Sequence, residues 1–188
     1  NLIILYAQNK DEQYTYIESA KEKGYEVLLL DSPIIPHLMQ KLESKKEKIK
    51  FSRVDSDTLE NLIKKDEEVI SKLTDEEKEK LKPMIETAVE NEKYTVQLEA
   101  LDSNSMPFML AQPEFMRRMK EMQQTGGGAM GNLPDMYSLI VNTNHELVGK
   151  ILNTRTEKKR NSLIKQSIDL AKLSQNSLTG KDLTEFIN

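Results

Sequence analysis

The sequence predicts a mixed α/β and α+β fold: a small α/β/α subdomain with a parallel sheet, then helices and short strands that end in a helical dimerisation bundle. Short apolar runs alternate with helical stretches over the first 54 residues. After a charged stretch at residues 55–72, a strand-like alternation and several amphipathic segments follow. The 188 residues suffice for two domains, which we place at residues 1–70 and 71–188.

In the first domain we expect strands at residues 2–7, 26–30 and 49–54, separated by helices at 11–23 and 34–43. Gly24 is expected to cap the first helix, because glycine adopts the left-handed backbone conformation found at helix ends. Ile34, Leu38 and Leu42 fall on one face of the second helix. Strands joined by such helices pair in parallel through right-handed crossovers. The first strand begins almost at residue 1 without an initiator methionine, so we expect a piece of a longer protein.

In the second domain, Thr74 and Glu77 have capping-box spacing and predict a helix at residues 75–89. Pro83 lies inside that helix and predicts a break or kink near Leu81. Alternating apolar and polar residues predict a strand at 94–101. Further along, we expect a strand at 136–142, a short helix at 147–153, a helix at 162–173 and a last helix capped by Thr179.

Composition argues against several classes of function. A net charge of -4 disfavours a nucleic-acid binder, and the basic group at residues 155–160 is too small to change that. No apolar run approaches the length of a membrane span, so we expect no membrane partner. The chain has no cysteine, which rules out disulfides and thiolate metal sites and fits a cytoplasmic location.

Catalytic chemistry has little support in the sequence. His37 and His145 lie far apart and have no acidic or histidine partner at metal-ligand spacing, so we expect structural histidines. The glycines at 126–128 resemble a phosphate loop, but neither Lys-Ser nor Lys-Thr follows them. We therefore expect no catalytic residue, no metal ligand and no enzyme activity in this chain.

Methionine is concentrated in one segment, because seven of the nine methionines fall between Met106 and Met136. Within it, one group of side chains has helical spacing and forms what we call the apolar stripe: Phe115, Met116, Met119 and Met122. Arg117, Arg118, Lys120 and Glu121 are expected mostly on the opposite side. Methionine surfaces adapt to partners of different shape. The residues alone leave two interpretations open: an exposed binding face, or a stripe buried in the domain's own core.

The last two helices carry apolar residues with no obvious partner in the sequence. These residues are Leu163, Ile164, Ile168, Ala171, Leu173, Leu183, Phe186 and Ile187. A short helix pair does not easily bury all its apolar faces alone, so pairing with the same helices of a second chain would form a four-helix bundle. Docking onto the preceding sheet is the equally weighted alternative.

Several stretches together resemble the heat-shock protein 90 chaperone family in its bacterial form. They are Asp11-Glu-Gln, Lys21-Glu-Lys-Gly-Tyr-Glu-Val-Leu-Leu-Leu-Asp31 with Ser32-Pro33, Met116-Arg-Arg-Met119, Val141-Asn-Thr-Asn-His145 and Leu170-Ala-Lys-Leu-Ser174. The resemblance covers essentially the whole chain in order. It implies the end of the middle domain at residues 1 to about 70, followed by the C-terminal dimerisation domain.

The resemblance implies part of a cytoplasmic, homodimeric, ATP-dependent chaperone of the heat-shock response that binds unfolded proteins. ATP and Mg²⁺ would bind in an N-terminal domain outside this chain, so we expect no cofactor here. Client contacts are expected at Met106, Met109, Phe115, Met116, Met119 and Met122, and the dimer interface at the eight residues of the last two helices. The alternative is a purely structural dimerisation domain with the methionine-rich helix buried in its core.

Overall fold

The computed structural model describes residues 2–63, 69–89, 94–126, 136–175 and 177–188, with the backbone alone described for residues 122–126. The chain forms two compact units, each with its own sheet. The first unit comprises Asn1–Lys64 with Ala111–Met136, and the second comprises Lys65–Leu110 with Tyr137–Asn188. The methionine-rich segment from residue 111 thus groups with the first unit. The division of the chain into domains at residues 1–70 and 71–188 stays a prediction.

The first unit is built on a three-stranded parallel sheet. Its elements are β1 (Leu2–Ala7), α1 (Tyr14–Glu22), β2 (Leu28–Leu29), α2 (Ile35–Lys45), β3 (Ile49–Arg53), α3 (Leu59–Leu62) and α5 (Glu114–Gly126). The strand order is β2-β1-β3, and β1 pairs in parallel with both neighbours. The expected strands and parallel pairing are confirmed, while β2 is shorter than predicted.

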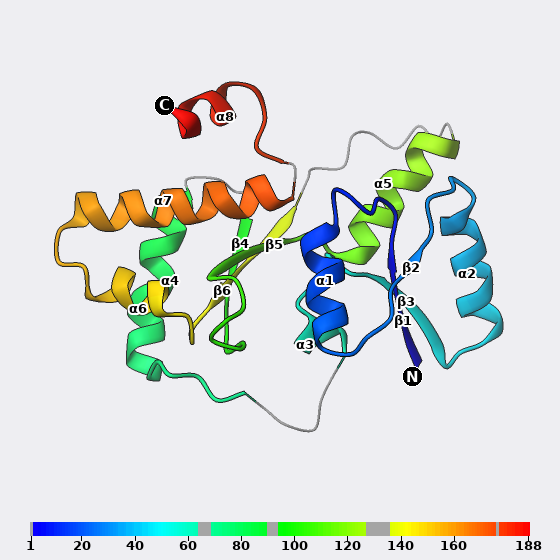
Figure 1. The fold of residues 1–188 in the computed structure, drawn as a ribbon, viewed down its shortest axis with the longest axis horizontal. Coiled ribbons are helices and arrows are strands. Elements are labelled where there is room, and N and C mark those ends of the chain that lie inside the picture. Colours follow the sequence, from blue (N-terminus) through cyan, green and yellow to red (C-terminus); the bar gives the residue numbers. More distant parts are fainter. Residues whose placement is uncertain (1, 64–68, 90–93, 127–135, 176) are drawn as a thin grey trace. The chain divides into compact units, whose positions relative to one another are not determined.

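The strand order determines where the helices of this unit lie. The chain crosses from β1 to β2 in one direction and from β2 to β3 in the other, so right-handed crossovers place α1 and α2 on opposite faces of the sheet. Figure 1 shows the strands flanked by these two helices. Tyr6, Met39 and Phe51 form a buried cluster. Gly24 follows α1 with a φ of +81°, which confirms the predicted glycine cap.

The second unit contains a second three-stranded sheet and most of the helices of the C-terminal half. Its elements are α4 (Asp75–Val89), β4 (Tyr94–Glu99), β5 (Phe108–Ala111), β6 (Tyr137–Asn142), α6 (Glu146–Asn153), α7 (Glu157–Ser174) and α8 (Gly180–Ile187). The strand order is β4-β6-β5, and β4 and β6 run parallel. The sequence did not predict β5. Its four residues lie in the methionine-rich segment, which has no strand-like alternation.

Helix α4 confirms one expectation and corrects another. The Thr74 backbone N–H donates to the Glu77 carboxylate at 2.9 Å, and the Glu77 N–H donates to the Thr74 hydroxyl at 3.3 Å, so the capping box is present. Of the predicted break or kink near Leu81, the break is wrong, because the helix continues from Asp75 to Val89, while the kink stays a prediction. Leu81 and Ile85, on either side of the proline, are fully buried, and this packing holds the helix together despite the missing backbone donor.

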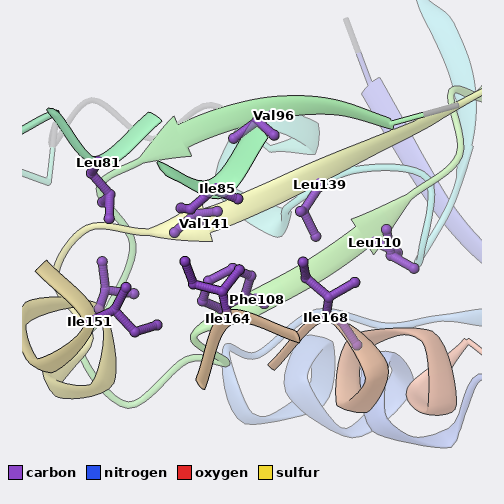
Figure 2. Packing of buried hydrophobic residues seen from close by; sticks show 12 residues of the cluster. Leu81, Ile85, Val96, Phe108, Leu110, Leu139, Val141, Ile151, Ile164 and Ile168 are labelled. Atoms are coloured by element: carbon purple, nitrogen blue, oxygen red, sulfur yellow. The ribbon is translucent and has the colours of Figure 1, made fainter. Parts of the chain in front are cut away.

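The core of the second unit lies between the sheet and helices α4, α6 and α7. Figure 2 shows Ile164 and Ile168 reaching from α7 toward strand residues that include Leu139 and Val141. Further buried members come from α4 and α6, including Ile85 and Ile151. The inner face of α7 is therefore covered by its own sheet.

The motif at residues 141–145 ties loops of the second unit together. Buried Asn142 accepts from the Leu101 N–H at 3.2 Å, and its amide donates to the Asp102 carbonyl at 2.8 Å. The Asn144 amide donates to the carbonyls of Leu101 and Ile70, both at 3.0 Å. These contacts satisfy backbone groups that no strand pairs, so the two asparagines have a structural role.

Candidate functional site

Helix α5 presents the apolar stripe, and its orientation departs from the usual pattern of an amphipathic helix. Phe115 is 70% exposed, Met116 and Met119 are half-buried, and Arg117 is only 3% exposed. The predicted helix is confirmed, and Arg117 lies opposite Phe115 as expected, but it is the side with Arg117 that is buried. The helix lies against its unit through its charged face, because that face meets polar partners at the end of the parallel sheet.

Glu114 is the centre of these polar contacts. Its carboxylate accepts from the Tyr6 hydroxyl at 2.8 Å, from the Arg53 backbone N–H at 3.2 Å, and from Arg117 and Arg118 at 2.6 and 2.7 Å. Burial by itself would raise the pKa of Glu114. The positive charge of Arg117 and the hydrogen bonds from Arg117 and Tyr6 outweigh burial and hold this pKa below its ordinary value.

Arg117 fills the space between α5 and the first strand. It donates to the Tyr6 hydroxyl and to Glu121, and to the Gln8 side chain at 3.3 Å, and its guanidinium lies 5.6 Å from the centre of the Tyr6 ring. Burial by itself would lower the pKa of Arg117. The negative charge of Glu114, together with Tyr6 and Glu121, outweighs burial and raises this pKa above its ordinary value, so the guanidinium stays ionised. Burial and Glu114 together raise the pKa of Tyr6.

Arg118 connects α5 to α2 and β3. It donates to Glu43 of α2 at 2.8 Å and to the Phe51 carbonyl of β3 at 2.9 Å. Glu43 in turn accepts from the Phe51 backbone N–H at 2.7 Å. We call Tyr6, Glu43, Glu114, Arg117 and Arg118 the Glu114 cluster. Through it, three elements of the first unit contact α5.

A cavity of about 510 Å³ lies between α2, β3 and α5. Phe115 and Met119 of the apolar stripe line it, together with apolar side chains that include Pro36 and Phe51. Its charged lining residues are Glu43, Glu47, Lys50, Glu114 and Arg118. The sequence did not predict this cavity, because its lining comes from segments more than 60 residues apart.

The predicted client contacts divide between the two units. Phe115, Met116 and Met119 lie on α5 in the first unit, whereas Met106 and Met109 belong to the second unit, before and within β5, where both are half-buried. The side chain of Met122 lies outside the described residues. The apolar stripe of α5 is therefore the part of the predicted set that forms a described surface.

The predicted dimer residues divide between a buried and an accessible group. Ile164, Ile168 and Ala171 are in the core of the second unit, and Leu163 packs against it, as the docking alternative requires. Leu173 and Ile187 are exposed, and Leu183 and Phe186 are half-buried. Exposed Leu170, which was not among the predicted residues, lies on the same helix as Leu173. Whether this outer surface pairs with a second chain stays a prediction.

Of the two histidines, His145 has the structural role expected from the sequence. His145 is the N-cap of α6, and its Nδ1 accepts from the Leu147 N–H at 3.0 Å, while His37 is exposed on α2. Within the described ranges, no group of three or more His, Asp or Glu side chains is arranged to hold a metal ion. The helices described also include none long and apolar enough to cross a membrane.

Comparison with known proteins finds relatives that are named as chaperones. No family model matches it. The chain is 44% identical over 157 residues to the chaperone protein HtpG of Bacteroides fragilis strain 638R, covering 81% of this chain and 23% of that protein. It is 42% identical over 158 residues to the HtpG of Bacteroides thetaiotaomicron, with the same shares covered. With the HtpG of Porphyromonas gingivalis strain ATCC 33277, identity is 40% over 177 residues, or 92% of this chain and 26% of that protein. The chain spans about a quarter of the length of these relatives.

Proposed function

Because the chain belongs to the HtpG family of chaperones, we propose that it is the part of such a chaperone that contacts non-native client proteins and pairs with a second copy. Client contact is assigned to the apolar stripe of α5, and pairing to the outer surface of α7 and α8. In the full-length chaperone, ATP and Mg²⁺ act outside this chain, and the protein works in the cytoplasm.

The observation that carries the client assignment is the reversed burial of α5. Leaving a large apolar side chain in water forgoes about 1.5–3 kcal/mol relative to burying it. Phe115 remains 70% exposed while Arg117 on the opposite face is buried. A helix that buries its charges and leaves its apolar residues accessible is arranged to bind an apolar partner. Methionine side chains in the same stripe suit partners of varied shape.

The cavity beside the stripe supports the same assignment. Phe115 and Met119 extend the accessible stripe into the cavity of about 510 Å³. We propose that an apolar side chain of a client enters this cavity while neighbouring client residues lie along the stripe. The buried aromatic or aliphatic anchor would then supply most of the binding energy, as in other protein interfaces.

Client contact is tested with a double substitution of the stripe, Met116→Glu with Met119→Glu. We expect the variant to lose most of its suppression of client aggregation and to keep its fold, because both side chains are only half-buried. The matched control is Tyr14→Glu, which places a charge on an exposed aromatic residue of the same unit. Unchanged aggregation suppression by the stripe variant would refute the client role of α5.

The pairing assignment rests on the unburied residues of the last two helices. Helix α8 has no buried residue among those described, and Ile187 on it is 73% exposed. Leu170 and Leu173 of α7 are exposed as well. Two such surfaces in a symmetric dimer would cover each other, which is the usual arrangement for an isologous interface.

Sedimentation over a range of protein concentrations tests pairing. We expect a dimer for the unchanged chain and a shift toward monomer for Ile187→Asp. Ile34→Asp is the matched control, because Ile34 is 66% exposed in the first unit. A monomer at every accessible concentration, or equal effects of the two substitutions, would reject this interface.

The structural alternative, with the stripe buried in a core, differs in its prediction for methionine oxidation. We expect peroxide to oxidise Met116 and Met119 well before fully buried Met39. Equal protection of all three would favour the alternative.

We also expect that this chain alone has no ATP turnover above background, which a phosphate-release assay measures.

A further inference from the structure

We propose that the Glu114 cluster is a positioning device that fixes α5 on the first unit with its apolar stripe outward. The inference deepens the proposed client contact and rests on it, because it assigns how the stripe is displayed. Tyr6, Arg117 and Arg118 are the positioning residues, and none of them needs to touch the client.

The first step is that the buried contacts of α5 are polar. Among its described side chains, Arg117 is the one that is fully buried, and it meets Tyr6, Gln8, Glu114 and Glu121. Arg118 adds contacts to Glu43 and to the Phe51 carbonyl. Apolar burial is non-directional, whereas hydrogen-bonded ion pairs require one geometry. The ion pairs of Arg117 with Glu114 and Glu121 lie within α5. The contacts that leave the helix, to Tyr6, Gln8, Glu43 and the Phe51 carbonyl, therefore determine which face of α5 turns inward.

The second step is the location of the cluster in the sheet. Tyr6 and Gln8 lie at the carboxyl end of β1, and Arg53 ends β3. In the order β2-β1-β3 the connections diverge between these two strand ends, and open parallel sheets have a crevice there that accepts ligands. In this chain Arg117 donates to Tyr6 and Gln8, so a segment 109 residues beyond Gln8 supplies the group bound at this edge.

The third step is the coupling among the contacts. Glu114 accepts from Tyr6, Arg117 and Arg118 at once, and each arginine also reaches a second carboxylate. Removing one partner leaves buried charges uncompensated, so the contacts are lost together. A client that meets a fixed helix has no ordering cost for α5, whereas a released helix must be ordered during binding. Loss of the cluster therefore weakens client binding without any change in the stripe.

The experiment uses the 188-residue chain with Tyr6→Phe, which removes one hydroxyl and keeps the buried ring. Tyr14→Phe is the matched control, because the Tyr14 side chain is exposed on α1 of the same unit. Hydrogen exchange followed by mass spectrometry reports on the amides of α5 and, for comparison, on those of α7 in the second unit. Binding is measured with a reduced, carboxymethylated protein that remains unfolded.

For Tyr6→Phe we expect exchange of the α5 amides to rise about tenfold relative to α7, because two hydrogen bonds with charged groups are lost. Reporter binding should weaken by about three- to tenfold, and Tyr14→Phe should change neither quantity. Arg118→Lys provides a second variant. It keeps the charge but cannot span Glu43, Glu114 and the Phe51 carbonyl together, so the same two changes are expected.

Unchanged exchange of α5 in both variants would overturn the positioning role. Faster exchange of α5 with unchanged reporter binding would overturn the coupling to the stripe. The Met116→Glu, Met119→Glu variant separates this inference from the proposed function. If that variant also binds the reporter normally, client contact through α5 is wrong, while the exchange data still decide whether the cluster positions the helix.

Discussion

Helices α5 and α7 are both amphipathic, but α7 buries its apolar face, whereas α5 buries its charged face. Helix α7 places Ile164, Ile168 and Ala171 in the core of the second unit. Helix α5 buries Arg117 and leaves Phe115 exposed. The apolar face of a helix is buried only where a complementary apolar surface is available. Around α5, the available partners are instead the Tyr6 hydroxyl and the Gln8 side chain at the carboxyl end of β1, and the Glu43 carboxylate of α2.

The difference separates a structural helix from a presenting helix. In α7 the hydrophobic effect supplies the contact energy, so the helix stabilises its unit. In α5 the buried ion pairs offset their own desolvation and contribute orientation more than stability. Substitutions in α7 should therefore change folding, whereas those in the stripe of α5 should change binding.

The largest expected effect is in the core of the second unit. Ile164→Ala should lower the free energy of unfolding by about 2–5 kcal/mol, because it removes buried methyl groups and leaves a cavity. Urea unfolding monitored by circular dichroism measures the change. Lys165→Ala on the same helix is the control and should stay within about 0.5 kcal/mol, since Lys165 is exposed. Similar losses for both would contradict the assigned inner face of α7.

Arg117→Met should have the next largest effect. It keeps the length of the side chain but leaves Glu114 and Glu121 without this cation, and the lost charged hydrogen bonds correspond to about 1.5–3 kcal/mol. We expect hydrogen exchange to accelerate in α5 and not in α7. The control is Lys48→Gln, which removes one positive charge from an exposed position of the first unit. Acceleration limited to α7, or none, would show that α5 does not depend on its charged face.

Acidification should weaken the first unit through Glu114. Because the folded-state pKa of Glu114 is lowered, its contribution to stability is fully present above the ordinary value of 4.5 and is lost as the pH falls through the folded-state pKa. Thermal unfolding between about pH 3 and about pH 6 should show the unchanged chain more stable than Glu114→Gln at the upper end. The difference should shrink as the pH falls. If the stability difference between the two proteins grew on acidification, folding would raise the pKa of Glu114 instead of lowering it.

The smallest expected effect on stability is that of Phe115→Ser. The side chain is exposed, so the free energy of unfolding should change by no more than about 0.5 kcal/mol. Binding of the unfolded reporter should nevertheless weaken, because Phe115 contributes to both the stripe and the cavity. A substantial loss of stability with normal binding would mean that Phe115 stabilises the fold, as the buried residues of α7 do, and does not contact the client.

The sequence predicted the features that depend on neighbouring residues. The capping box of Thr74 and Glu77, the glycine cap at Gly24 and the spacing of the apolar stripe are local, and the structure confirms each of them. Strand β5 was missed because its short apolar run has no alternation, and the break at Pro83 was wrong because packing of Leu81 and Ile85 outweighs one missing donor. The cavity and the Glu114 cluster join segments that no local pattern relates.

By itself, the sequence determined that the segment with the apolar stripe forms an amphipathic helix rich in methionine, because helical periodicity depends on spacing within one segment. It also determined the parallel sheet of the first unit, since helical connections require that pairing. Only the tertiary structure decided which face of each amphipathic helix is buried. That choice depends on the surface against which the helix packs. Tyr6, which accepts a hydrogen bond from Arg117, lies 111 residues away from Arg117 in the chain.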